Sequence, residues 1–220
     1  MESWEEEGLG LGLKKTDVEA MREAWRREKA APEMLEFEEE LVRRLREQMQ
    51  LQEETGEDED EDEDELMLQI QHMDLDRALF LLKAYLRIRL TKLQKHIFFY
   101  ASQSQSQSHS SNLLSPQELL FCQRCLHATS RHLHHSLLSH LPPHYQSLSR
   151  QSTSSDHDDM LHLHAPHLDT FVFCKTTTHV GAFQLDDTGD DILDLVVDDL
   201  YVLRYNSIRA LVQSRQIHLI

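Results

Sequence analysis

Two cysteines and a group of histidines are the residues whose types and spacing could bind a metal. Cys122 and Cys125 form a Cys-x-x-Cys pair, and ten of the fifteen histidines lie between His127 and His167. Zinc takes four ligands in tetrahedral geometry, and such a pair normally lies in a tight turn. Here the pair falls inside a predicted helix and no second pair follows. We therefore expect no metal site and interpret the histidines as a surface bias, with a His/Cys zinc protein as an alternative.

No sequence pattern predicts a catalytic centre or a cofactor site. The chain lacks the Gly-x-Ser-x-Gly pattern of a nucleophilic serine, and Cys174 falls in a strand-like run without an activating signature. The six glycines form no phosphate-binding loop. Asp186, Asp187, Asp190 and Asp191 match no calcium-loop spacing and indicate a solvated hairpin loop. We expect no enzyme, no catalytic residue and no cofactor.

The acidity of the chain is concentrated in one tract. The formal net charge is −17, and eleven of the thirteen residues from 53 to 65 are Asp or Glu. Like charges at this density repel one another and bury nothing, which predicts an exposed, disordered loop. An acidic histone-binding chaperone that acts through residues 53–65 is an alternative. Because the remainder is also mildly acidic, extended contact with a phosphate backbone is disfavoured.

One predicted helix concentrates basic residues with no acid between them. They spread over everything outside its leucine stripe, which indicates a solvated or partner-facing surface and only indirect or weak DNA contact. These residues are Arg77, Lys83, Arg87, Arg89, Lys92 and Lys95.

The three cysteines, an acidic N-terminus and short apolar runs indicate an intracellular, reducing compartment. The cysteine spacing forms no disulfide framework, and the longest apolar run is residues 97–101, far short of a membrane span. We expect no membrane contact.

Capping signals and apolar spacing predict four helices. The first begins at Thr16, which has capping-box spacing with Glu19, and ends near Pro32; the second covers residues 33–52. The third covers residues 66–100, and residues 102–112 form a Ser/Gln loop. In the fourth, Ser115 is the N-cap, Pro116 is the first helical residue and Glu118 completes a capping box. This helix ends before Leu141.

The third helix is apolar on two sides. One side carries a leucine stripe from Leu75 to Ile97, and the other carries Leu81, Tyr85 and Ile88. A helix of this kind needs two surfaces to pack against, which favours its own domain on one side and a partner chain on the other.

Composition changes after residue 166. Short β-prone runs cover residues 171–173, 192–197, 200–205 and 216–220. The predicted fold is mainly α with a small C-terminal β domain. It comprises a disordered tail (1–15), a bundle-like helical domain (16–143), a linker (144–166) and a small β-rich domain (167–220).

Four groups of segments resemble the Sld-five subunit family of the GINS replication complex. They are EAWRREK and APEML at residues 23–29 and 31–35; YLRIRLTKL at 85–93; LSPQEL and HLPP at 114–119 and 140–143; and LDTFVF, LRY, LV and LI at 168–173, 203–205, 211–212 and 219–220. The order and spacing of these segments are similar to the family's. Arg215 stands where a glycine is usual, which predicts a different turn before the last strand.

The resemblance implies a non-catalytic scaffold in a four-chain complex with the three Psf subunits. Through this complex it implies association with the MCM helicase ring and its Cdc cofactor in the CMG replicative helicase. The place of action would be the nucleus, in the initiation of DNA replication and in fork progression.

Nine apolar residues are the predicted partner interface, and core packing is an equally good interpretation of each. They are Leu81, Tyr85, Ile88, Phe171, Phe173, Leu203, Tyr205, Leu219 and Ile220.

Overall fold

The computed structural model describes residues 15–57, 65–105, 113–146, 165–185 and 192–220. Most of the predicted N-terminal tail, the acidic tract, the Ser/Gln loop, the linker and the aspartate-rich loop lies outside these residues. The chain forms two compact units: residues 1–26 with 38–87, and residues 27–37 with 88–220. We call them the first and the second unit and describe each by itself.

The first unit is helical. It contains most of α1 (Lys15–Ala30), all of α2 (Glu39–Glu57) and the first part of α3 (Glu65–Lys95). Buried residues at helical spacing form its core: Met21, Ala24, Leu41, Val42, Leu45, Met49, Leu75, Ala78, Leu81, Leu82 and Tyr85. Residues 53–57 belong to α2 and Glu65 begins α3, so the predicted loop is wrong for these residues, and residues 58–64 lie outside the described part of the chain.

The second helix begins at Glu39 and not at residue 33, so this part of the prediction is wrong. Residues 31–37, here called the connecting segment, are not helical, because side chains bind their backbone groups. Tyr100 accepts a hydrogen bond from Met34 N–H at 3.0 Å. Lys92 donates to Glu33 O at 2.8 Å, and Arg89 donates to Leu35 O at 2.7 Å. These bonds replace the i→i−4 bonds of a helix.

The predicted third helix is divided into α3 and α4 (Ile97–Gln105). Hydrogen bonds still span the division, from His96 N–H to Lys92 O at 3.0 Å and from Tyr100 N–H to His96 O at 3.1 Å. The four residues 102–105 of the predicted Ser/Gln loop belong to α4.

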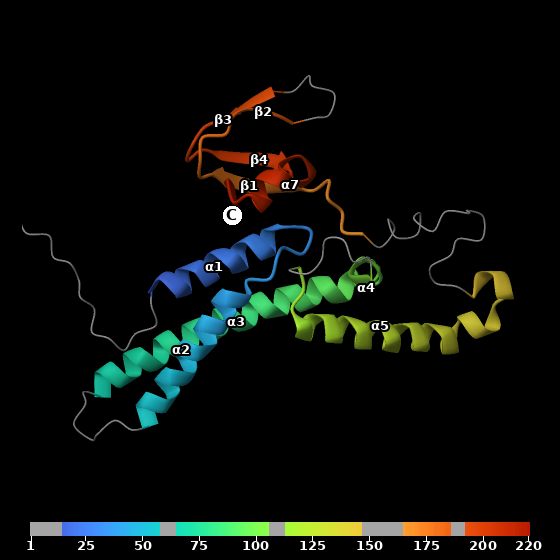
Figure 1. Ribbon diagram of the computed structural model, residues 1–220, viewed down its shortest axis with the longest axis horizontal. Helices are drawn as coiled ribbons and strands as arrows, with labels where there is room; N and C mark the ends of the chain where they lie inside the picture. Colours follow the sequence, from blue (N-terminus) through green and yellow to red (C-terminus); the bar gives the residue numbers. More distant parts are fainter. Residues whose placement is uncertain (1–14, 58–64, 106–112, 147–164, 186–191) are drawn as a thin grey trace, which may run out of the picture. The chain divides into compact units, whose positions relative to one another are not determined.

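The helix α5 (Pro116–Ser136) has the predicted capping box. Ser115 Oγ accepts from Glu118 N–H at 3.2 Å, and Ser115 N–H donates to Glu118 Oε2 at 2.9 Å. Two short 3₁₀ turns follow, η1 (Leu138–His140) and η2 (Pro143–Tyr145). The first part of α5 lies beside α4 (Figure 1), and the two helices share a core. This core contains Met34, Leu93, Ile97, Tyr100, Ala101, Leu114 and Cys122.

The described C-terminal residues form two antiparallel sheets and one helix. The strands are β1 (Phe171–Thr176), β2 (Gly181–Gln184), β3 (Ile192–Leu195), β4 (Leu200–Arg204) and β5 (Ile217–Leu219). The larger sheet has the order β4-β1-β5, and β2 pairs with β3. The mainly α fold with a small C-terminal β domain is therefore confirmed. The prediction missed β2 and the helix α7 (Tyr205–Gln213).

Alternation along the strands places one face of the larger sheet in a core. Val172, Cys174, Leu203, Ile217 and Leu219 point into it, and α7 packs on this face through Ile208, Leu211 and Val212 (Figure 1). Ala31 and Leu35 of the connecting segment complete the same core.

The turn after α7 keeps a left-handed residue at the position where a glycine was expected. Arg215 has φ = 59°, its N–H donates to Val212 O at 3.2 Å, and Gln216 N–H donates to Leu211 O at 3.0 Å. This is the Schellman arrangement that ends many helices. An arginine therefore adopts the conformation that glycine favours. The expected difference in turn type stays a prediction.

Candidate functional site: a buried charge network and an exposed sheet face

Arg89 lies in the protein interior, with 0% of its side chain exposed. It is placed on α3 at helical spacing with the buried residues Tyr85 and Leu93. The predicted solvated surface is therefore wrong for Arg89, and also for Lys92, whose side chain is 14% exposed. A buried guanidinium is stable only when its charge and its donors are satisfied.

All five N–H donors of Arg89 have acceptors. Nε and Nη2 donate to the two carboxylate oxygens of Glu118, at 2.7 and 3.0 Å. Nη1 donates to Glu28 Oε2 at 3.2 Å and to Leu35 O at 2.7 Å. Nη2 also donates to Leu113 O at 2.7 Å. The bidentate pair with Glu118 joins α3 to the N-terminal turn of α5, where the same carboxylate completes the helix cap.

Lys92 extends the network from Arg89 toward the connecting segment. Its Nζ donates to Glu28 Oε1 at 2.9 Å and to the backbone oxygens of Glu28 and Glu33. Burial lowers the pKa of the Lys92 ammonium, and the neighbouring Glu28 carboxylate acts in the opposite direction. Glu28 therefore faces two cations, Arg89 and Lys92.

Glu33 connects the network to α7. Arg209 Nε and Nη2 donate to Glu33 Oε1 and Oε2, each at 2.7 Å, and the Tyr205 hydroxyl donates to Oε1 at 2.8 Å. Burial and then the Glu33 charge raise the pKa of Tyr205 well above its ordinary value. The connecting segment is thus held by α7 on one side and by α3 on the other.

The charge network is balanced, with three bases and three acids: Arg89, Lys92 and Arg209 with Glu28, Glu33 and Glu118. Each carboxylate accepts hydrogen bonds from at least one cation, so no charge of the network is buried without a partner. These ion pairs link five chain segments, namely α1, the connecting segment, α3, α5 and α7, which is a structural role.

The outer face of the β4-β1-β5 sheet carries exposed apolar side chains together with Lys175 and with Arg204, whose guanidinium lies 5.7 Å from the centre of the Phe171 ring. Phe171 and Phe173 are 66% and 65% exposed. In the strand register Phe173 lies opposite Val202, and Lys175 lies opposite Leu200. Ile220 N–H donates to Phe173 O at 3.1 Å, which places the chain end beside Phe173. We call the exposed Phe171, Phe173, Leu200, Val202 and Ile220 the outer sheet face.

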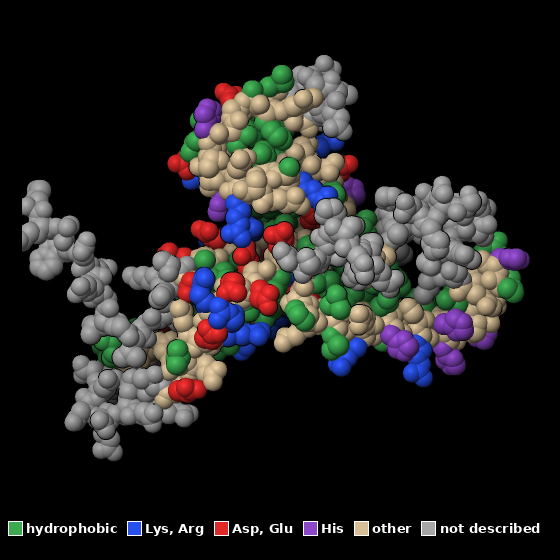
Figure 2. All heavy atoms as spheres, in the orientation of Figure 1, with side chains coloured by type: hydrophobic (Ala, Val, Ile, Leu, Met, Phe, Trp, Pro, Cys, Tyr) green, Lys and Arg blue, Asp and Glu red, His purple; other side chains and the backbone are tan. Residues whose placement is uncertain are grey.

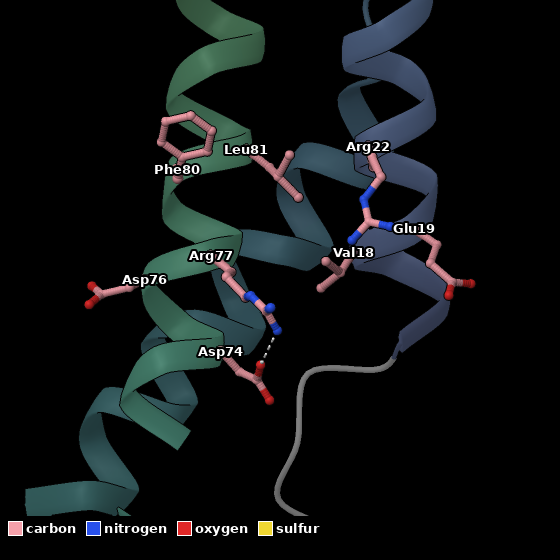
Figure 3. A pocket seen from close by; sticks show the side chains of 8 residues that line it. All are labelled: Val18, Glu19, Arg22, Asp74, Asp76, Arg77, Phe80 and Leu81. Atoms are coloured by element: carbon pink, nitrogen blue, oxygen red, sulfur yellow. Dashed lines mark ion pairs between the residues drawn. The ribbon is translucent and has the colours of Figure 1, made fainter. Parts of the chain in front are cut away.

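The first unit contains a cavity of about 570 Å³ between α1 and α3 (Figure 3). Leu81 and Arg77 point from α3 toward α1, whereas Asp76 points away. Arg77 pairs with Asp74 at 3.5 Å, an exposed pair of small energetic value. Phe80 at the rim is 65% exposed. The remaining lining residues are Val18, Glu19 and Arg22 of α1.

The cysteines have the surroundings of structural residues. Burial raises the pKa of the Cys122 thiol and raises that of Cys174 to about 11, which disfavours the reactive thiolate. Within the described residues, no three His, Cys, Asp or Glu side chains are placed to hold a metal ion. The same part of the chain contains no helix long and apolar enough to cross a membrane.

Two family models match the chain. The model of the GINS complex protein helical bundle domain matches residues 37–137, and the model of the DNA replication complex GINS protein SLD5 C-terminus matches residues 166–220. A protein of Arabidopsis thaliana named DNA replication complex GINS protein SLD5 is 41% identical over 93% of this chain and 91% of its own length. The chain belongs to the GINS SLD5 family.

More distant SLD5 proteins align over almost the same length. The Bos taurus protein is 30% identical, and the Mus musculus protein is 29% identical. Each alignment covers 92% of this chain and 88% of the relative. The resemblance inferred from the sequence is therefore confirmed, and neither the zinc nor the histone-chaperone alternative gains support from these SLD5 matches.

The segments that carried the resemblance to the SLD5 family contain most of the charge network. Glu28 and Glu33 lie in EAWRREK and APEML, Arg89 and Lys92 lie in YLRIRLTKL, and Glu118 lies in LSPQEL. Sequence reasoning quoted these segments but missed that their charges meet. The partners of Arg89 are 61 and 29 residues away in sequence, so no local spacing indicated them.

The structure divides the nine predicted interface residues of this SLD5-family chain into two groups. Leu81, Tyr85, Leu203, Tyr205 and Leu219 are buried within the chain, and Ile88 is half-buried. Phe171, Phe173 and Ile220 are exposed and belong to the outer sheet face. Contact of any of the nine with a partner stays a prediction.

Proposed function

We propose that this chain is a non-catalytic structural subunit of a GINS complex that acts in DNA replication. Its direct partners would be the three Psf subunits. Through them the complex would join the MCM helicase ring and its Cdc cofactor in the CMG helicase, in the nucleus and with indirect or weak DNA contact. Membership of the SLD5 family supports this proposal, because the relatives carry the name DNA replication complex GINS protein SLD5.

The exposure of the outer sheet face is the main structural observation that supports the proposed scaffold role. Removing apolar surface from water is favourable by a free energy of roughly 25 cal/mol per Å². A contiguous exposed apolar face is typical of a protein interaction site. The outer sheet face would dock on another subunit, while the inner face of the same sheet packs on α7.

We retain the proposed division into a helical domain (16–143), a linker (144–166) and a β-rich domain (167–220). In this arrangement the Glu33 contacts with Tyr205 and Arg209 would help to present the outer sheet face in one orientation.

Co-expression with the three Psf subunits tests the proposal. Phe173→Asp should abolish or strongly weaken co-purification, because a charge in a buried interface is costly. Ile192→Asp is the matched control, since Ile192 is 68% exposed on β3, outside the outer sheet face. Both variants should unfold at the temperature of the unchanged chain. Undiminished assembly by a folded Phe173→Asp variant would contradict the docking role.

Truncation before Leu168 provides a second test, because it removes both sheets and α7. Assembly should weaken. Survival of full co-purification would show that the helical part alone carries the contacts.

Deletion of residues 53–65 separates the scaffold from the histone-chaperone alternative. A GINS scaffold should still assemble with the Psf subunits, whereas a chaperone would lose its histone partner.

A further inference from the structure

The sequence from Leu119 to Ser155 contains three arginines, six histidines and no acid. The whole chain has a net charge of −17, so this stretch differs sharply from the rest. The described part of it covers most of α5, η1 and η2. Neither the charge network nor the outer sheet face includes any of these arginines or histidines.

The basic side chains of α5 lie on its surface. Glu118 and Cys122 are buried, whereas Arg124, His127, Arg131, His134 and His135 are all exposed. Positions 124, 127, 131 and 134 follow one another at steps of three and four, and position 135 lies four residues after 131, so the five share one side of the helix. Figure 2 shows histidines gathered along α5 and the turns that follow it. We call these five residues the basic row.

No carboxylate faces the basic row from the described elements that pack on α5. The helix α4 carries no charged residue, and η1 carries only His140. The turn η2 adds His144. Glu118, at the start of α5, is buried and bound to Arg89. Among the described residues, the row therefore faces no carboxylate that would neutralise it.

Exposed apolar side chains lie on the same stretch of chain as the basic row. Leu120 lies on α5 four residues before Arg124, and Leu137, Leu141 and Tyr145 lie in the turns that follow the helix. Leu137 is 59% exposed and Tyr145 is 58% exposed. A surface that combines basic and apolar side chains fits a ligand that combines carboxylate and apolar groups.

This combination favours a protein partner over nucleic acid. In the described part of the stretch only Arg124 and Arg131 carry a fixed positive charge, and affinity for a phosphate backbone rises with the number of such charges. Leucine side chains gain nothing from a phosphate backbone, whereas an apolar protein surface buries them.

The favourable effect of cations at a helix C-terminus does not account for the row. That effect is confined to the last turn, which contains His134 and His135. Arg124, His127 and Arg131 lie before it.

We infer that the basic row, with Leu137, Leu141 and Tyr145, is a docking surface for an acidic, partly apolar surface of another protein. Histidine changes its charge between about pH 5 and 8. Attraction to carboxylates should therefore strengthen as the pH falls through this range. The inference is independent of the outer sheet face, since the two surfaces share no residue.

Fluorescence anisotropy with the full chain tests the inference. The first probe is a labelled amphipathic peptide with glutamates on one helical face and leucines on the other, and the second is a short DNA duplex. The peptide should bind about tenfold more tightly near pH 6 than near pH 7.5. The triple change His127→Gln, His134→Gln and His135→Gln should remove this difference.

Two controls make the result specific. The change of His72 and His179, which are also exposed, to Gln should leave the pH dependence intact. Arg124→Gln with Arg131→Gln should weaken peptide binding several-fold at both pH values. All of these positions are exposed, so folding should be unaffected.

Three outcomes would overturn the inference: equal peptide affinity at the two pH values, a pH dependence that survives the triple histidine change, or DNA bound as tightly as the peptide. Psf assembly measured near pH 8, where histidine is mostly neutral, reports on the proposed function separately.

Discussion

Arg209 on α7 and Glu33 in the connecting segment form a bidentate ion pair across 176 residues of sequence. Both hydrogen bonds are 2.7 Å long, and the Tyr205 hydroxyl donates to the same carboxylate at 2.8 Å. Glu33 is thus the residue through which α7 is joined to the network around Arg89 and Lys92.

We predict that this pair contributes measurable coupling. Arg209→Leu should lower the free energy of unfolding by about 1–2 kcal/mol, because the Glu33 carboxylate loses its two strongest bonds. A double-mutant cycle with Glu33→Gln, measured by urea unfolding, should give a coupling of about 1 kcal/mol. Arg209→Lys should recover only part of it, since an ammonium cannot form the fork. A coupling near zero would show that the pair is incidental.

Arg89 should be among the residues least tolerant of substitution. Arg89→Leu leaves Glu28 and Glu118 buried without their main partner, and we expect a loss of about 3–5 kcal/mol. Lys83→Leu is the control on the same helix, because Lys83 is exposed; its effect should stay within about 0.5 kcal/mol. Chemical denaturation of both variants checks this prediction. A loss below about 1 kcal/mol for Arg89→Leu would contradict a structural role of the network.

Stability should fall at alkaline pH. Burial raises the pKa of Cys174 from 9.0 to about 11 and that of Tyr100 from 10.0 to about 12, and it also raises that of Tyr205. The folded chain therefore holds these protons at pH values where the unfolded chain has released them. The free energy of unfolding should decrease as the pH rises above about 9, by up to about 1.4 kcal/mol per pH unit for each group.

Lys92 changes the pH dependence of the free energy of unfolding in the opposite direction. Its pKa is lowered, so the folded chain releases this proton at a lower pH than the unfolded chain does. The buried groups with raised pKa values, which are Cys122, Cys174, Tyr100 and Tyr205, outnumber Lys92, so the net slope should be negative. Tyr100→Phe removes one of these four groups and should make the slope between about pH 10 and 12 shallower by about one proton. The slope is the readout, since the loss of the bond from Met34 N–H lowers stability at every pH. An unchanged slope would exclude Tyr100 as a source.

Arg215→Gly should stabilise the chain. Arg215 holds a left-handed conformation that costs a residue with a Cβ roughly 1 kcal/mol more than glycine. We expect a gain of about that size in thermal or urea unfolding. Arg215→Ala retains a Cβ and should gain far less, which separates the backbone effect from the loss of the arginine side chain. Equal gains for the two variants would point to the side chain.

Local sequence signals predicted the elements that local interactions stabilise. Ser115, Pro116 and Glu118 lie within four residues and specify the start of α5 by themselves. The β-prone run at residues 171–173 predicted a strand, and β1 begins at Phe171. The helix α7 also carried a signal that was not used, since Tyr205, Ile208, Leu211 and Val212 have helical spacing.

Only the tertiary structure decided where the charges of the chain belong. The sequence predicted a solvated or partner-facing Arg89, because the basic residues of its helix spread over everything outside the leucine stripe and arginine is mostly exposed. Its burial depends on Glu28 and Glu118, which come from other segments and meet it only in the folded chain. The connecting segment departs from its predicted helix for the same reason, since distant side chains satisfy its backbone. Short-range patterns encode helices, caps and strands, whereas ion pairs between segments far apart in sequence arise only when the chain folds.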